Sequence, residues 1–244
     1  MRTIAFALQK GGTGKTSCSV TVAQMAAEAG HRVLMVDADP QGSASSWLLT
    51  EAPPHELADV LTGAAALADT AVPVAPGMEL VPTFGIGGGL RAAADNLEGR
   101  PFHIDDAVRK PAAAAGYDLV VFDTSPANGR LERAVLAACD EVVPVLTAEL
   151  FAVDGLEVFR DFVANVESGL RVSVGSPRLV LNLVNDSFRR HAAYRRTIER
   201  TGLEVYEVHQ DARMPEAQMT NTALPATSRA AAPLRELASA VAGG

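Results

Sequence analysis

Short apolar runs alternate with longer amphipathic stretches along most of the 244-residue chain. Their length and periodicity predict strands near residues 3–8, 32–37, 78–82, 118–123, 140–146 and 178–184, with a weaker strand near 203–208. The longer stretches predict helices over about 15–29, 101–115, 129–138, 152–167, 187–201 and 230–241. Strands that alternate with helices are typical of an α/β fold, a mostly parallel central sheet with helices on both faces. We expect one domain over residues 1–244.

A glycine-rich loop follows the first apolar run and has the composition of a phosphate cradle. Glycines leave backbone N–H groups free to point at phosphates, and the N-terminus of the following helix adds a favourable dipole. Lys15 would reach the phosphates, and the Thr16 hydroxyl would ligate Mg²⁺. The usual pattern has glycine at position 9, whereas this chain has Gln9 there and a second cation, Lys10, beside it. The predicted nucleotide-binding residues of the loop are Lys10, Gly11, Gly12, Thr13, Gly14, Lys15, Thr16 and Ser17.

Three aspartates follow apolar runs and are candidates for work on the phosphates. Asp123 ends the run 119–122, at the C-terminal rim of a predicted buried strand, where the ligand crevice of such sheets lies. Asp37 and Asp39 lie at the end of another strand, and residues i and i+2 of a strand share a face. Both carboxylates can therefore face the crevice. The alternative role for this pair is an N-cap or turn before Pro40.

The loop pattern and three further segments resemble the deviant Walker A class of ParA/MinD ATPases. Residues 37–42 read Asp-Ala-Asp-Pro-Gln-Gly and are similar to the D-x-D-P-Q-G segment of ParA proteins. Residues 119–126 resemble their Walker B strand, with Ser125 where proline is usual, and residues 142–155 resemble their next strand and helix start. The resemblance implies a P-loop ATPase of the ParA family, of the short type without an N-terminal DNA-reading domain.

The same resemblance implies a role for each candidate residue. Lys10 would reach across a two-fold interface, so that two ATP molecules are sandwiched in an ATP-bound homodimer. Asp39 would position the attacking water. Asn182, at a strand end, would contact adenine, and an Asx turn is the alternative for it. The implied catalytic residues are Lys10, Lys15 and Asp39, and the implied metal ligands, with Mg²⁺ held directly or through water, are Thr16, Asp37 and Asp123.

Positive charge gathers in one segment although the formal net charge is −8. Residues 178–200 hold six arginines and two acidic residues, six minus two, a local charge of +4. On the predicted helix, Arg189, Arg196 and Arg200 lie within about 40° of one another. Such a patch can direct DNA to one face, and a solvated charged face is the alternative. By resemblance to short ParA proteins, which bind DNA without sequence preference, the DNA-binding residues are Arg189, Arg190, Arg196, Arg200 and Arg213. Gln210 and Asn185 depart from the family pattern.

The remaining composition bears on location and partners. No run reaches the ~18 apolar residues that span a bilayer, and no charged-then-apolar leader opens the chain. Cys18 and Cys139 are too few for a zinc site or a disulfide framework. We expect a cytoplasmic, nucleoid-associated ATP hydrolase with ATP and Mg²⁺ as cofactors. Its expected partners are a second copy, non-specific DNA and a ParB-like or other cargo adaptor that stimulates slow hydrolysis, with no membrane.

The predicted function is DNA segregation, and two related functions remain as alternatives. One is an ATPase that positions a non-DNA cargo on the nucleoid. The other is a MinD-like membrane-associated regulator, which the short and non-basic stretch 233–241 disfavours. Metabolic P-loop reductases are disfavoured, because they would need cluster-binding cysteines and Cys18 and Cys139 are poorly placed for that role. The glycine-rich stretch 84–90 is expected to be a plain loop. The sequence does not specify the cargo, the adaptor, or a plasmid rather than a chromosomal role.

Overall fold

A computed structural model of the chain describes residues 1–86, 88–148, 152–185, 198 and 201–243. These residues form an eight-stranded sheet with the order β3-β4-β2-β5-β1-β6-β7-β8. Every neighbouring pair is parallel except β3 with β4. The strands are β1 (Arg2–Ala7), β2 (Val33–Ala38), β3 (Val72–Ala75), β4 (Met78–Val81), β5 (Leu119–Thr124), β6 (Glu141–Thr147), β7 (Arg178–Val184) and β8 (Glu204–His209). The predicted parallel α/β sheet is confirmed.

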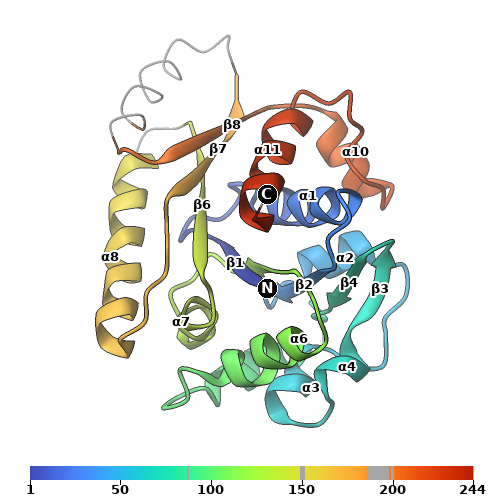
Figure 1. Cartoon of the computed structure of the whole chain (residues 1–244), viewed down its shortest axis with the longest axis vertical. Coiled ribbons are helices and arrows are strands. Elements are labelled where there is room, and N and C mark those ends of the chain that lie inside the picture. Colours follow the sequence, from blue (N-terminus) through green and yellow to red (C-terminus); the bar gives the residue numbers. More distant parts are fainter. Residues whose placement is uncertain (87, 149–151, 186–197, 199–200, 244) are drawn as a thin grey trace.

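Helices cover both faces of the sheet, as Figure 1 shows. One face carries α1 (Lys15–Glu28), α2 (Ser43–Leu48), α10 (Arg213–Met219) and α11 (Ala231–Ala242). The other carries α3 (Leu57–Thr62), α4 (Leu67–Thr70), α5 (Leu90–Asp95), a π-helical turn η1 (Asp105–Arg109), α6 (Lys110–Ala114), α7 (Arg130–Ala137) and α8 (Ala152–Leu170). Each face has its own apolar core because the central strands are buried on both sides, which is the usual state of parallel strands. No helix in the described ranges has the length and apolarity to cross a membrane.

The predicted helices and strands match the structure except at short elements. The helix expected over 101–115 contains η1 and α6, and the helix expected over 187–201 lies outside the described residues apart from Ile198. The sequence reading missed β3, α2, α4, α5 and α10. Each of these spans seven residues or fewer, which is too short for a clear period. Helix α10 also contains Pro215, which is tolerated because it lies in the first helical turn.

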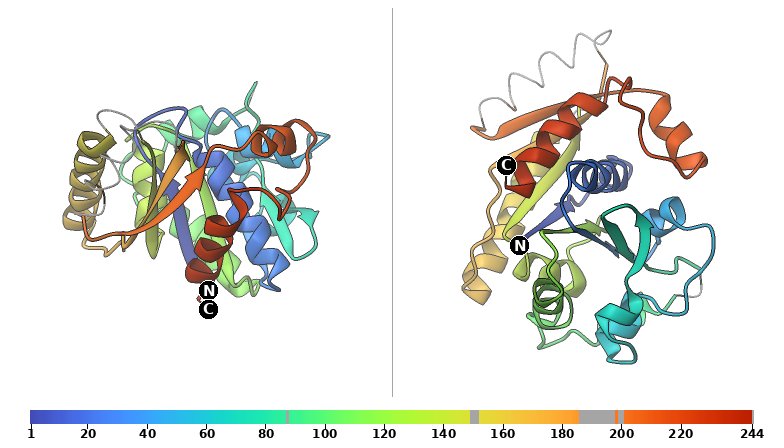
Figure 2. Two further views of the ribbon diagram at one scale, coloured as in Figure 1. Left: turned by 90° about the horizontal axis from the view of Figure 1, so that it is seen from above. Right: turned by 45° about the vertical axis from the view of Figure 1, so that its right-hand side comes forward.

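The two chain ends lie side by side at the edge of the sheet opposite the strand C-termini (Figure 2). The Arg2 guanidinium donates to the backbone oxygen of Ala240 over 3.1 Å and to the Glu141 carboxylate over 2.8 Å. Helix α11 also packs along α1. The C-terminal helix is therefore part of the core layer that backs the first strand.

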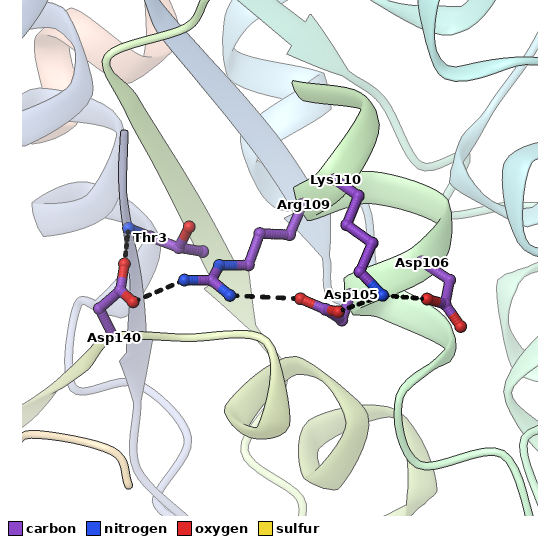
Figure 3. A network of polar contacts seen from close by, with 6 residues as sticks. All are labelled: Thr3, Asp105, Asp106, Arg109, Lys110 and Asp140. Carbon is purple, nitrogen blue, oxygen red and sulfur yellow. Dashed lines mark hydrogen bonds and ion pairs between the residues drawn. The ribbon is translucent and has the colours of Figure 1, made fainter. Parts of the chain in front are cut away.

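A chain of polar contacts joins η1 and α6 to the start of β1 (Figure 3). Asp140 accepts from the backbone N–H of Thr3 and from Arg109, both over 2.8 Å. Lys110 continues the chain to Asp106, and the pKa of that carboxyl is lowered by the lysine. Exposed pairs of this kind contribute little stability each. Their effect is to fix the helical layer at the edge away from the strand C-termini.

The carboxyl ends of β1, β2 and β5 meet at one edge, because the three strands are parallel neighbours. Asp37 of β2 is the register partner of Asp123 of β5, and Phe6 of β1 pairs with Asp123 from the other side. The loops that leave these strands, residues 8–14, 39–42 and 125–129, therefore converge. In open α/β sheets this is where ligands bind.

Gly42 allows a close backbone approach at this edge. Its φ is +65°, and a Cβ placed there would lie 2.5 Å from the Thr83 oxygen and 2.8 Å from the Gly85 nitrogen. Gly63 also has a left-handed conformation, with φ of +78°, but a Cβ there would meet nothing within 4 Å. A comparison of substitutions at these two glycines therefore separates the cost of left-handed backbone strain from the cost of a steric clash.

We predict that Gly42→Ala lowers the free energy of unfolding by more than about 2 kcal/mol, since it adds a backbone clash to left-handed strain. Gly63→Ala carries the strain alone and should lose about 1 kcal/mol. Urea denaturation of both variants measures the difference. Equal losses would show that residues 39–42 and 83–85 have room to separate.

Candidate nucleotide-binding site

The glycine-rich loop is folded as a cradle between β1 and α1. Gly12 and Gly14 have left-handed φ values of +74° and +88°, which L side chains rarely adopt. A Cβ at Gly14 would also lie 2.1 Å from the side-chain nitrogen of Asn182. The Thr13 hydroxyl is buried and has no hydrogen-bond partner within the described parts of the chain. These features fit a loop that presents its backbone N–H groups to an anion.

Lys15 lies at the base of this loop with its ammonium group turned inward. It is 6% exposed, and its Nζ donates to the backbone oxygen of Lys10 over 3.0 Å. Burial lowers the pKa of Lys15, while the nearby carboxylates of Asp123 and Asp39 oppose that shift. Lys10 itself is exposed at the rim of the loop. The structure thus separates the two lysines, one inside the cradle and one at its outer edge.

Thr16 and Asp123 come together as the sequence predicted. The Thr16 Oγ1 donates to one oxygen of Asp123 over 2.7 Å, and the Ser19 hydroxyl donates to the other over 3.1 Å. Complete burial, with Asp37 close by, raises the pKa of Asp123 to about 8. Ser19 was not predicted, although it lies one helical turn from Thr16 and shares its face.

This hydroxyl and carboxylate are a donor set that suits Mg²⁺. The ion prefers oxygen ligands, and it is commonly held by one or two protein groups together with phosphates and water. Thr16 and Asp123 supply two such oxygens beside the phosphate cradle, and a cation there would offset the burial of the carboxylate. They are the residues that would hold the ion.

Asp37 and Asp39 are directed differently although they are two residues apart. Asp37 is fully buried, and one of its oxygens accepts from both the backbone N–H and the hydroxyl of Ser45, each over 2.7 Å. Burial raises the pKa of Asp37 to about 6. Asp39 is 8% exposed, accepts from the Gln41 N–H over 2.8 Å and lines the cavity of the glycine-rich loop. Asp39 thus combines the turn role with a place at the cavity, whereas the proposed metal role of Asp37 stays a prediction.

Two cavities adjoin the glycine-rich loop. The first, of about 560 Å³, is lined by Gly11, Gly12, Thr13, Gly14, Lys15, Thr16, Asp39, Gln41, Ser43, Ser46, Trp47, Pro126 and Gln218. The second, of about 580 Å³, shares Gly12, Gly14 and Gln218 with the first and extends between the ends of β7 and β8 and the helix α10. A phosphate chain in the first would lead naturally to a base in the second. The same edge of the sheet brings together the predicted site residues of the loop with Asp37, Asp39, Asp123 and Asn182.

Asn182 lies on the wall of the second cavity. Its side-chain nitrogen donates to the backbone oxygen of Thr13 over 2.7 Å, and the residue is buried. The next residue, Leu183, has φ of +55°, and the β7–β8 register shifts there. Asn182 therefore holds the shape of the loop, and its contact with adenine stays a prediction.

A C-terminal segment closes the cavities and was not predicted to do so. Gln218 donates to the Ser17 hydroxyl over 2.9 Å, and the Trp47 indole donates to the Thr222 oxygen over 3.2 Å. Both contacts join residues more than 170 positions apart. No local sequence signal marks Gln218, because its partner is set by tertiary packing alone.

The predicted DNA-binding arginines are mostly beyond what the structure describes. Arg189, Arg190, Arg196 and Arg200 lie outside the described residues. Arg213 begins α10, donates to the Thr227 oxygen and lies 3.8 Å from an Asp211 oxygen. Its chain neighbours Ala212 and Met214 line the second cavity.

Comparison with known proteins gives a family match over most of the chain. The model of a family described as an AAA domain matches residues 1–174. The chromosome partitioning protein ParA of Caulobacter vibrioides strain NA1000 / CB15N is 31% identical over 186 residues, which cover 75% of this chain and 70% of that protein.

Two solved structures share the fold. An ATP complex of an aspartate-to-alanine variant of McdA from Cyanothece superposes with a TM-score of 0.88 at 20% identity, covering 100% of this chain and 96% of that one. Cobyrinic acid a,c-diamide synthase from Mycobacterium smegmatis, with an ATP analogue and magnesium, has a TM-score of 0.83 at 26% identity. The shared part covers 98% of this chain and 93% of that one.

The buried acids predict how stability depends on pH. In the absence of Mg²⁺ and nucleotide, the carboxyls of Asp123 and Asp37, with pKa values of about 8 and about 6, keep protons that the unfolded chain releases near its ordinary value of 3.8. The folded state binds more protons in this window, so these two groups lower the free energy of unfolding as pH rises through it. Asp123→Asn should remove up to about 1.4 kcal/mol of that fall per pH unit.

Urea unfolding at several pH values from about 5 to 8 measures this slope. Asp106→Asn is the control, since the pKa of that exposed carboxyl is lowered by Lys110 and it titrates below the window. An unchanged slope in Asp123→Asn would mean that Asp123 is ionised in the free protein.

Proposed function

Since the chain belongs to the ParA family of P-loop ATPases, we propose that it is an ATP-switched dimer that binds DNA without sequence preference and drives DNA segregation. The observation that carries the proposal is the joining of three groups at one sheet edge. A glycine cradle with Lys15, the Thr16–Asp123 pair at 2.7 Å and the Asp39 carboxylate all border or underlie one cavity. These are the groups that phosphoryl transfer to water requires.

Each of these groups has its own role in the hydrolysis of ATP at this site. The loop N–H groups and Lys15 offset the phosphate charge, and Thr16 and Asp123 would hold Mg²⁺, which neutralises charge on the leaving phosphates. Asp39 orients the attacking water. One of its oxygens is held by the Gln41 N–H, so its orientation depends on the turn 39–42. We expect slow turnover in the isolated protein and faster turnover when an adaptor, ParB-like or another cargo protein, fixes that turn.

The different positions of Lys15 and Lys10 support a dimer. Lys15 serves the nucleotide of its own chain from inside the cradle, whereas Lys10 lies exposed at the rim. In a two-fold dimer with the cavities face to face, Lys10 would reach the nucleotide of the partner. The γ-phosphate then stabilises the interface, and its loss loosens the dimer.

DNA binding depends on the dimer because one basic stripe makes few phosphate contacts. Two stripes on one rigid body engage the same duplex, and the second engagement is effectively intramolecular. The residues expected to contact DNA are those predicted from the sequence, Arg189, Arg190, Arg196 and Arg200, with Arg213 as a further contact. This interaction would place the protein on the nucleoid in the cytoplasm.

A membrane partner is disfavoured by the packing of the C-terminal helix. In α11 the apolar residues Leu234, Leu237 and Val241 are buried in the core against α1 and β8. An amphipathic membrane anchor would need such a face to be free. A non-DNA cargo carried on the nucleoid by the same ATPase cycle is the second candidate, and the fold shared with McdA is compatible with it.

We predict that Lys10→Ala abolishes the ATP-dependent dimer but leaves nucleotide binding by the monomer largely in place. Lys15→Ala should lose ATP binding itself, because its charge lies inside the cradle. Sedimentation with ATP and Mg²⁺ measures the dimer, and a fluorescent ATP analogue measures binding. An intact ATP dimer in Lys10→Ala would contradict the sandwich arrangement.

The function itself is tested by DNA binding with ATP, with ADP and without nucleotide, at two salt concentrations. Binding should require ATP, be independent of sequence and weaken with salt, with a log–log slope of about −0.9 per phosphate neutralised. The triple substitution of Arg189, Arg196 and Arg200 by Glu should abolish DNA binding. The control is that this triple variant still dimerises with ATP. DNA binding that is equal with ATP and ADP would contradict the proposed switch.

A further inference from the structure

The glycine-rich segment after β4, expected to be a plain loop, is held at both ends by one buried carboxylate. The Glu56 side chain accepts from the backbone N–H of Phe84 over 2.7 Å and from that of Gly89 over 2.5 Å, one with each oxygen. Glu56 is 5% exposed and caps the start of α3. Its own N–H donates to Asp59 over 2.9 Å, which fixes its backbone as well. The carboxylate therefore closes the segment as a clamp.

The clamped segment lies directly against the turn that carries Asp39. A Cβ at Gly85 would lie 2.2 Å from the Gln41 oxygen, and a Cβ at Gly42 would lie 2.5 Å from the Thr83 oxygen. Backbone meets backbone on both sides, with no side chain between them. Residues 83–85 therefore lie in direct backbone contact with residues 41 and 42 and support their position.

Thr83 ties the same segment to the strand beneath the turn. Its hydroxyl donates to the backbone oxygen of Asp37 over 2.6 Å, and its N–H donates to the Ser45 hydroxyl over 2.8 Å. The Gln41 N–H in turn holds the Asp39 carboxylate over 2.8 Å. A continuous set of contacts thus runs from Glu56 through the segment 83–89 to Asp39. Glu56 reaches none of the cavity-lining loop residues directly.

We propose that Glu56 is a positioning residue for ATP hydrolysis: by holding the N–H groups of Phe84 and Gly89, it keeps residues 83–85 against residues 41 and 42 and so fixes the Asp39 carboxylate that orients the water. The proposal rests on the proposed role of Asp39. It predicts that loss of the clamp slows turnover without weakening nucleotide binding, since the glycine-rich loop follows β1 and Thr16 lies in α1. A purely structural role for Glu56 would change stability alone.

The experiment compares Glu56→Gln with wild type. The amide keeps the size of the side chain, but its NH₂ group faces a backbone N–H and only one clamp bond can remain. We expect kcat for ATP to fall by about tenfold, the scale of effect of a misplaced orienting group. The dissociation constant for ATP with Mg²⁺ should stay within about twofold of wild type. A lowered affinity with unchanged kcat would overturn the proposal.

The matched control is Glu167→Gln. The Glu167 carboxylate also accepts from a backbone N–H, that of Val174 over 2.8 Å, but it lies on α8 and ties the turn before β7. It should leave kcat unchanged. An equal fall in kcat in both variants would show a general effect of loosened packing and overturn the proposal.

A double-mutant cycle with Asp39→Ala separates this proposal from the proposed function. If Glu56 acts through Asp39, Glu56→Gln should cause no further fall in the residual turnover of Asp39→Ala, measured with radiolabelled ATP. The same fold loss in both backgrounds would overturn the proposal. Wild-type turnover in Asp39→Ala would instead refute the catalytic role of Asp39.

Amide hydrogen exchange gives a readout that does not depend on activity. In Glu56→Gln, peptides that contain Phe84 and peptides that contain Gln41 should both exchange faster, while those of the loop 10–16 stay unchanged. Faster exchange at Phe84 with full protection at Gln41 would show that the clamp and the turn are not coupled.

Discussion

The arrangement of the site depends on two acidic side chains at adjacent positions of a buried sheet. Asp37 and Asp123 are register partners on β2 and β5, and both are fully buried. Burial raises the pKa of both carboxyls, and the neighbouring Asp37 raises that of Asp123 further. Each carboxyl is satisfied by neutral hydroxyl or backbone donors, and the compensating cations lie next to one of them. Asp123 adjoins Lys15 and the position suited to Mg²⁺, whereas Asp37 turns to Ser45.

That division explains why one aspartate lies beside Thr16 and Lys15 and the other supports the turn. The Asp123 carboxyl accepts from Thr16, so a divalent ion bound there would lower the pKa of Asp123 and keep its carboxyl ionised. Without the ion, the free protein keeps this carboxyl protonated. Asp37 holds the start of α2 and, through its backbone oxygen, Thr83. The turn that carries Asp39 lies between these supports and the segment 83–85. Catalytic geometry is thus built by packing around the acidic pair.

Much of this could be predicted from the sequence because the signals are local. Apolar runs of about six residues gave the strands, and the order of glycines, Lys15 and Thr16 gave the phosphate cradle. The aspartates were found because they end strands. Ser19, Gln218 and Glu56 were not found, since their partners lie at Asp123, Ser17 and the segment 84–89. Glu56 in particular has no local partner that marks it, because only the fold brings Phe84 and Gly89 to it.

The family match ends at residue 174, yet the nucleotide cavities are completed by residues beyond it. The segment 211–229 is closed on itself by Asp211, which accepts from the N–H groups of Arg213 and Arg229 and from Ser228; these bonds lower its pKa. It meets the glycine-rich loop through Gln218 and Ser17. A nucleotide base in the second cavity would touch both the loop and this segment, so binding adds contacts across their junction and stabilises that arrangement. Arg213 lies on the segment itself. The second cavity and Arg213, the predicted DNA-binding residue that the structure describes, are therefore connected through one structural element.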